Sequence, residues 1–217
     1  MYSYQLDLTI ISERIFWKEM AGRPIECDRD EAARKATRRF WDCGYTGTSV
    51  ADLVAETGLN RFGLYGEFGG KKGMFLKACE VYSESAQRCV FKPLSESSNP
   101  EESLHQFFAG VVAAQLDDNK PGGCLMANTL AEQGCTDPEI QQAVQDHFKA
   151  VEEAFAHTLR RAADKKGTDE SARVAAALLL NSLLGLVQLA RLKPGREVLE
   201  SVGNNAVRAA IRVAREK

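Results

Sequence analysis

The chain has 217 residues and carries 28 Lys and Arg against 30 Asp and Glu, so its formal net charge is −2. This balance argues mildly against a nucleic-acid-binding protein, although an acidic second domain can mask a local basic face. A hydrophobic content of 44% is that of a globular protein with a real core. Six cysteines occur without a CxxC pair, which favours reduced thiols in a cytoplasmic protein and argues against structural zinc.

The first nineteen residues, MYSYQLDLTIISERIFWKE, lack the basic start, long apolar run and cleavage site of a secretory signal. Two interpretations of residues 1–19 stay open. They are an extension that precedes a true start at Met20, or an extra helix whose apolar side chains need burial against this protomer or a partner.

A first helix is predicted from a cap at Asp28 or Asp30 to about Cys43, with Ala36 and Phe40 on its inward face. Four cations crowd its outer surface. These cations are Arg34, Lys35, Arg38 and Arg39. They form either a solvated helix face or a surface that lies close to DNA phosphates.

The stretch from Thr48 to Phe75 predicts a helix, a tight turn, a short helix and the start of another helix. Thr48 and Ser49 are N-cap types, and Asp52 stands three residues after Ser49 as in a capping box. Gly58 ends this helix, and Asn60 caps the next one, which is predicted from about Arg61 to Phe68. Helices joined by so short a turn cross steeply, which is helix-turn-helix geometry.

From about Met20 to Cys79 the sequence resembles the DNA-binding domain of the TetR family of bacterial transcriptional repressors. The match runs over roughly 60 ordered positions, so it is far more specific than a lone helix-turn-helix motif. The matching features are Ala36–Phe40, Gly44-Tyr45, Thr48-Ser49-Val50, Gly58-Leu59-Asn60, Leu64-Tyr65, Phe68-Gly69-Gly70-Lys71 and Met74-Phe75.

The resemblance, together with side-chain chemistry, implies a set of DNA contacts. Thr48 would offer its hydroxyl to a phosphate at a helix N-terminus, and Arg61 is the best candidate to read guanine. Tyr65 and Lys71 stand at phosphate-contacting positions of the family. The expected DNA-binding residues are Arg23 in a short basic arm, Thr48, Asn60, Arg61, Phe62, Tyr65 and Lys71.

Two positions depart from the family pattern. The pair Phe62-Gly63 places a bulky residue first, where a small one is commoner, and Phe62 could pack on a thymine methyl or cover the domain. Glu67 is acidic where a neutral or basic residue is more usual. Its carboxylate could accept a hydrogen bond from cytosine N4, or it could repel phosphates.

The remaining chain predicts further helices. A fourth helix runs from Lys71 to about Val90, and a polar loop follows from Pro93 to Pro100. Asp137 and Pro138 are a strong helix start. Periodicity predicts the other helices at about 103–116, from near Cys124, at about 138–163, 171–192 and 197–215.

The expected fold is all-α. The family resemblance implies an N-terminal three-helix helix-turn-helix domain at 20–70 and a C-terminal helical ligand-binding and dimerisation domain at 71–217, with the helix at 71–90 linking the two. The last two helices resemble the pair through which family members form a dimeric four-helix bundle. The apolar segment between Arg173 and Arg191 has only seventeen residues, so a buried helix is favoured over a membrane span.

The motif GGCLMANTLAEQ places Cys124 at a predicted helix start and resembles a segment from one branch of the family. Some members of that branch respond to small reactive or unsaturated molecules. A thiol at a helix N-terminus can have a lowered pKa, and the alternative is a small buried residue. The candidate ligand-binding residues are Phe107, Phe108, Cys124, Met126, Asn128, Phe148 and Phe155.

These observations predict a cytoplasmic homodimeric repressor that binds a palindromic double-stranded operator and is released by a small-molecule effector. Two alternatives are a thiol-based repressor switched at Cys124 and a helical adaptor without DNA binding. An enzyme is disfavoured, because there is no glycine-rich phosphate cradle, HExxH or GxSxG motif. No metal or cofactor is expected, since the spacing of His147 and His157 fits no helical metal pair.

Overall fold

The computed structural model of the chain describes residues 29–91, 94, 96–132, 137–163 and 167–216. All regular elements in these ranges are helices, which confirms the predicted all-α fold. The predictions for residues 1–19, for Arg23 and for an Asp28 cap lie outside the described residues. Asp30 lies inside the first turn of the first described helix and therefore is not its cap.

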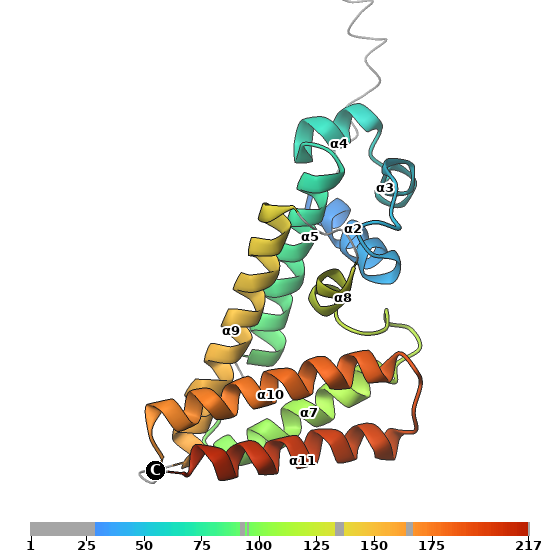
Figure 1. Cartoon of the computed structure of the whole chain (residues 1–217). Coiled ribbons are helices and arrows are strands. Elements are labelled where there is room, and N and C mark those ends of the chain that lie inside the picture. The colour runs from blue at the N-terminus through green and yellow to red at the C-terminus, as the bar shows by residue number, and fades with distance from the viewer. Residues whose placement is uncertain (1–28, 92–93, 95, 133–136, 164–166, 217) are drawn as a thin grey trace, which may run out of the picture.

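The helices α2 (Arg29–Cys43), α3 (Val50–Thr57) and α4 (Arg61–Phe68) form one end of the molecule, called here the reading unit (Figure 1). Both predicted caps are confirmed. Ser49 Oγ accepts from Asp52 N at 3.1 Å, and Asn60 Oδ1 accepts from Gly63 N at 2.7 Å. Gly58 ends α3 at φ 76°, a left-handed conformation in which glycine is unstrained.

Helix α5 (Lys71–Ala86) carries the chain away from the reading unit and continues as a π-helical segment, Gln87–Phe91. The reading unit and α5 share a core in which the rings of Phe40 and Phe75 pack edge to face, with centroids 4.8 Å apart. Buried side chains from later helices, Met126 and Ile140 among them, complete this core. The reading unit is therefore packed directly onto the rest of the chain.

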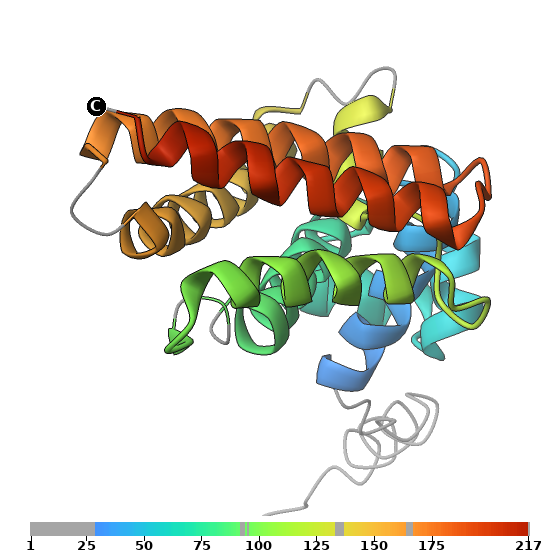
Figure 2. The same cartoon turned by 90° about the horizontal axis from the view of Figure 1, so that it is seen from below.

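The second half of the chain forms α7 (Pro100–Gln115), α8 (Leu125–Ala131), α9 (Pro138–Ala163), α10 (Asp169–Ala190) and α11 (Arg196–Ala214). Helix α9 runs beside α5, while α7, α10 and α11 pack together at the end opposite the reading unit (Figures 1 and 2). Helix α7 begins three residues before the predicted Ser103, because Asn99 caps it and Pro100 occupies its first turn.

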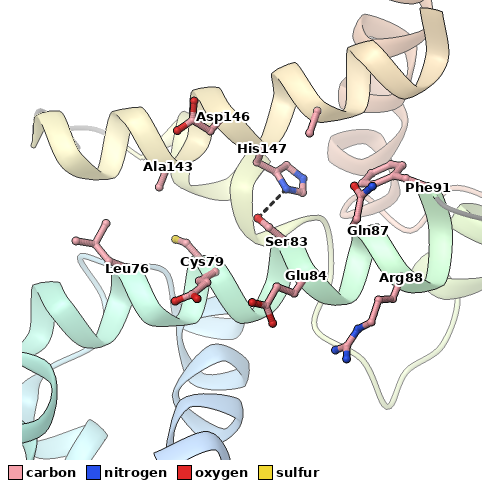
Figure 3. Close-up of a pocket in the computed structure, with 12 residues that line it drawn as sticks. Leu76, Cys79, Ser83, Glu84, Gln87, Arg88, Phe91, Ala143, Asp146 and His147 are labelled. Atoms are coloured by element: carbon pink, nitrogen blue, oxygen red, sulfur yellow. Dashed lines mark hydrogen bonds between the residues drawn. The ribbon is translucent and has the colours of Figure 1, made fainter. Parts of the chain in front are cut away.

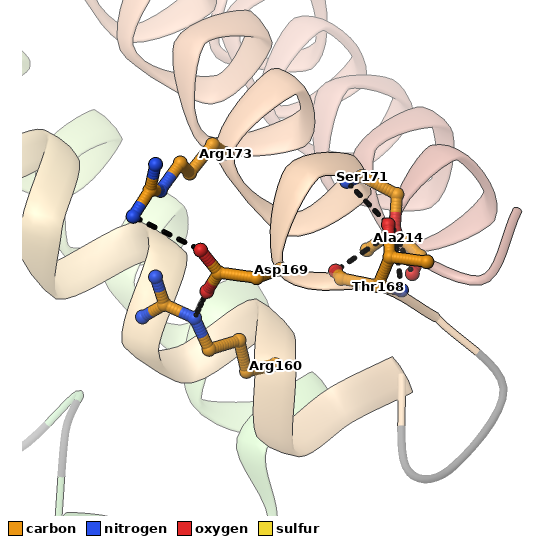
Figure 4. A network of polar contacts seen from close by, with 6 residues as sticks. All are labelled: Arg160, Thr168, Asp169, Ser171, Arg173 and Ala214. Atoms are coloured by element: carbon orange, nitrogen blue, oxygen red, sulfur yellow. Dashed lines mark hydrogen bonds and ion pairs between the residues drawn. The ribbon is translucent and has the colours of Figure 1, made fainter. Parts of the chain in front are cut away.

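A polar network fastens the ends of three helices (Figure 4). Thr168 Oγ1 accepts from Ser171 N at 3.0 Å, and the Ser171 hydroxyl donates to Ala214 O of α11 at 3.0 Å. Asp169 forms ion pairs with Arg160 of α9 and with Arg173. Helix α10 is long and apolar enough to cross a membrane by length and composition alone, but it packs against α7, α9 and α11.

Candidate DNA-reading surface and effector cavity

The first turns of α4 present large side chains to solvent. Phe62 is 88% exposed and Tyr65 is 57% exposed, while Asn60 and Arg61 are also exposed. Two large aromatic side chains exposed on one short helix make this surface a candidate for contact with a partner. The structure thus brings four of the expected DNA-binding residues onto one short helix and its cap.

Lys71 and Tyr65 lie at the junction of α4 and α5. The Lys71 ammonium sits 4.4 Å from the centroid of the Tyr45 ring, at the first residue of α5. The Tyr65 ring packs on Gly70, where a Cβ atom would lie 2.9 Å from Tyr65 Cε1. A cation, a phenol and the N-terminus of a 16-residue helix therefore share one surface, which is suited to an anion.

Thr48 does not occupy the expected position. Its side chain is 0% exposed, and its hydroxyl donates to Gly44 O at 2.8 Å, so it closes the turn after α2. Ser49, rather than Thr48, is the N-cap of α3. The prediction that the Thr48 hydroxyl contacts phosphate is therefore wrong.

Glu67 has a partner within the reading unit. Its carboxylate lies 3.3 Å from Arg29 Nε, and Arg29 also donates to Glu67 O at 2.9 Å. The guanidinium of Arg29 stands 5.4 Å from the centroid of the Phe68 ring. Arg29 thus ties the start of α2 to the end of α4, and its charge offsets the unusual carboxylate on the reading helix.

A cavity of about 570 Å³ lies between the reading unit and the other helices. This volume is in the range of small-molecule sites in proteins. Residues from α2, α5, α7, α9, α10 and the loop at 117–123 line it, so a bound molecule would touch both the reading unit and the second half of the chain. Three of the expected ligand-binding residues are on its wall: Phe107, Cys124 and Phe148.

The other four expected ligand-binding residues are not on the wall. Phe155 and Met126 are fully buried in the two cores, and Phe108 packs against Gly203 of α11. Asn128 Oδ1 accepts from Arg191 at 2.9 Å, which ties α8 to the end of α10. The prediction that Phe108, Met126, Asn128 and Phe155 line the cavity is corrected accordingly.

Cys124 is enclosed rather than activated. The Tyr82 hydroxyl donates to Cys124 Sγ at 3.1 Å, and burial raises the pKa of both side chains above their ordinary values. Hydrogen bonds from the backbone N–H groups of Met126 and Ala127 lower the pKa of the thiol, but burial raises it by more. The suggestion of a lowered pKa is not supported, and Cys124 serves as a neutral thiol on the cavity wall.

The sequence did not single out Trp41 and Tyr82 as cavity residues, or His147 as a member of the same wall. The Trp41 and Tyr82 rings meet edge to face at 5.0 Å, and Tyr82 lies 5.7 Å from His147. Burial lowers the pKa of His147 to about 4, so its ring is neutral at pH 7. The spacing of Phe75, Cys79 and Tyr82 along α5 was the available signal, because it places Tyr82 on the buried face.

His147 also borders an open groove of about 610 Å³ between α5 and α9 (Figure 3). Its Nδ1 lies 3.0 Å from Ser83 Oγ, and the two side chains face each other across the groove floor. The groove carries the acidic side chains Glu80, Glu84 and Asp146 beside Arg88. It is therefore more polar than the cavity and lies outside the reading unit.

Polar contacts join the reading unit and α5 to the second half of the chain. Glu132, at the end of α8, accepts from Tyr45 N at 2.7 Å and from Thr46 N at 3.0 Å. Lys72 of α5 forms ion pairs with Asp137 at 2.9 Å and with Glu139 at 2.7 Å. The end of α8 is therefore bonded to the turn after α2, and the start of α9 is bonded to α5.

Comparisons with known proteins agree with this arrangement. Residues 34–78 match the model for bacterial regulatory proteins of the TetR family, and residues 100–205 match a tetracycline repressor-like C-terminal domain. The chain is 31% identical over 182 residues to YezE, an uncharacterized HTH-type transcriptional regulator of Bacillus subtilis strain 168, covering 82% of this chain and 94% of YezE. The chain belongs to the TetR family.

Other relatives extend the match. The HTH-type transcriptional repressor ComR of Escherichia coli K12 is 37% identical over 112 residues, which are 51% of this chain and 53% of ComR. A cysteine mutant of the TetR family regulator CifR, solved with 26 bp double-strand operator DNA, is 28% identical with a TM-score of 0.78. That superposition covers 87% of this chain and 99% of CifR. The protein is therefore a DNA-binding transcriptional regulator and not an enzyme.

Proposed function

We propose that this TetR-family protein is a homodimeric, cytoplasmic repressor that binds a palindromic operator through α4 and is released by a small molecule in the cavity. The observation that carries the proposal is the exposed group on α4, next to a cation at the start of α5. Residues 20–70 would form the DNA-binding domain and residues 71–217 the ligand-binding and dimerisation domain. The operator complex of CifR and the repressor ComR support this role.

The exposed residues divide by chemistry. Asn60, Arg61 and Phe62 stand at the start of α4, where side chains of a recognition helix reach base edges in the major groove. The Arg61 guanidinium suits guanine O6 and N7, and the Phe62 ring suits a thymine methyl. Tyr65, one helix turn further on, and Lys71, at the start of α5, suit the phosphates that fix the register of the helix.

Exposed apolar side chains on α10 and α11 support the proposal that the protein is a dimer. Val174, Leu178 and Val198 are apolar side chains that these helices leave exposed in the single chain. A second copy packed on the same face by a two-fold axis would bury them and complete a four-helix bundle. The same axis would present two copies of α4 to successive major grooves.

Effector release requires a ligand that binds one state of the protein better than the other. The cavity supports such a coupling, because α2 forms part of its wall and also belongs to the reading unit. A molecule that fits the cavity only when α2 is displaced would change the spacing of the two α4 helices. The operator would then no longer fit both helices at once.

Binding to the DNA upstream of the protein's own gene tests the proposal. We expect a specific complex in fluorescence anisotropy whose affinity falls by about 10³-fold or more between 50 and 200 mM salt, as for proteins with several phosphate contacts. A scrambled duplex of the same length is the control. Absence of binding to either duplex, or affinity independent of salt, would contradict the repressor and favour an adaptor, whereas equal, salt-dependent affinity for both duplexes would place the operator elsewhere.

The dimer surface is tested with Leu178→Glu. Leu178 is 37% exposed in the single chain. A carboxylate there would be buried without a partner in both copies, at a cost of about 3 kcal/mol or more in dimer stability. Sedimentation should therefore show monomers at concentrations where the parent is a dimer. Leu130→Glu, an exposed leucine on α8, is the matched control and should remain dimeric. A dimeric Leu178→Glu protein would place the interface elsewhere.

A further inference from the structure

The charges on the cavity wall share one sign. Among the described residues that line the cavity, the charged side chains are Arg34, Arg38 and Lys120. All three residues are exposed, whereas Phe107 and Val151 on the same wall are buried. The cations therefore mark the end of the cavity that meets water, and the inner part is apolar.

Three polar side chains deeper in the cavity are already bonded to the protein, whereas the buried indole N–H of Trp41 has no hydrogen-bond partner among the described residues. The Tyr82 hydroxyl donates to Cys124 Sγ, and the Thr37 hydroxyl donates to Ala33 O at 2.7 Å. The Gln115 amide exchanges two hydrogen bonds with the backbone of Gly123. The inner wall thus suits an apolar body, since displacing any of these bonds would leave a buried group unpaired.

The three cations differ in what they already bind. Arg34 forms an ion pair with Glu31 at 2.9 Å, and Lys120 lies 3.7 Å from Asp117. Within the described part of the chain, Arg38 has no ion pair, and its guanidinium donates to Asn119 O at 2.8 Å. A guanidinium has five N–H donors in a planar fork that matches a carboxylate, so Arg38 retains donors for a ligand.

We propose that the effector is an amphipathic organic anion whose apolar body fills the inner cavity and whose carboxylate, or a similar anionic head, binds Arg38. This inference rests on the proposed effector site. The head group would compete with the Asn119 carbonyl for the Arg38 guanidinium. Because Arg38 belongs to α2, that exchange would break a bond between the reading unit and the loop at 117–123. Ligand binding would thereby change the position of the reading unit and lower the affinity for DNA.

Ligand binding without DNA tests the proposal. Trp41 lies on the cavity wall and reports occupancy by its fluorescence in a full-length Trp17→Phe protein, since the chain has 2 tryptophans. The probes are two matched pairs, decanoate with 1-decanol and 4-phenylbutyrate with 4-phenyl-1-butanol. For at least one pair we expect the carboxylate to bind about five- to tenfold more tightly, as a charge-assisted contact at a partly exposed site allows.

Substitutions in α2 test which residue makes the carboxylate bind more tightly than the matched alcohol. Arg38→Gln should remove the advantage of the carboxylate and leave the affinity for the alcohol unchanged, while Arg38→Lys should keep part of the advantage. Lys35→Gln removes an exposed cation of the same helix that does not line the cavity, and it should behave like the parent. Alcohols that bind as tightly as the carboxylates, carboxylates that do not bind at all, or a preference intact in Arg38→Gln would each overturn the proposal.

The readout separates this proposal from the proposed function. If the protein binds the carboxylates through Arg38 but forms no specific DNA complex, the proposal of an anionic ligand stands and the proposal of a repressor fails. A specific operator complex together with failure of all four probes to show a charge preference would retain the repressor and exclude the anionic effector.

Discussion

Arg61→Ala in both protomers is expected to weaken binding to the specific operator by roughly 10- to 100-fold for each half-site, since a bidentate contact to guanine contributes about 1–3 kcal/mol. Arg61 is exposed at the first residue of α4, and within the described part of the chain it has no ion pair that would be lost. The folded state should therefore be little affected. Anisotropy titrations with the operator and with single-base variants of each half-site measure the change.

A comparison with Lys71→Ala gives this prediction its control. Lys71 is proposed to contact phosphate, so Lys71→Ala should weaken binding to specific and scrambled DNA alike and reduce the salt slope by about 1 for each half-site. Arg61→Ala should instead reduce discrimination at one or two base pairs. Arg212→Ala removes an exposed cation in the last turn of α11 and should leave both quantities unchanged. If Arg61→Ala weakened all duplexes equally, Arg61 would be a phosphate contact and another side chain would read the bases.

The elements that the sequence predicted well are those that local chemistry determines. The Ser49–Asp52 box, the Asn60 cap and the Asp137-Pro138 start each depend on atoms within three residues, and each is present in the structure. Thr48 shows the limit of this reasoning. Adjacent Thr48 and Ser49 have equal capping chemistry, and the turn after Gly44 decides which hydroxyl is buried.

The cavity depends on contacts between distant parts of the chain, which sequence periodicity cannot resolve. Phe107 and Phe108 are neighbours with the same chemistry, but only Phe107 lines the cavity, because the rotation of α7 against α11 determines which ring faces inward. Asn128 has its partner in Arg191, 63 residues later, and Glu67 has its partner in Arg29, 38 residues earlier. No pattern within a single helix predicts such pairs.

Gly73→Ala is expected to disrupt the junction that positions both Tyr65 and Lys71. Gly73 lies in the first turn of α5, and a Cβ atom added there would stand 1.6 Å from the carbonyl oxygen of Phe68, the last residue of α4. That neighbour is backbone, so it cannot rotate aside, and α5 must move relative to α4. Overpacking of this kind costs about 1–3 kcal/mol and exceeds the gain of up to about 1 kcal/mol from replacing a helical glycine.

Urea denaturation measures this cost as a lower midpoint at an unchanged slope. Gly66→Ala is the matched control, because Gly66 lies within α4 and nothing stands within 4 Å of an added Cβ atom. Gly66→Ala should therefore be as stable as the parent or more stable, whereas Gly73→Ala should be less stable. Operator affinity of the folded Gly73→Ala protein should also fall by at least about tenfold, since a displaced α4 cannot keep the proposed base contacts and the proposed Lys71 phosphate contact in register. A Gly73→Ala protein with parental stability and affinity would show that the α4–α5 junction yields without moving the recognition helix.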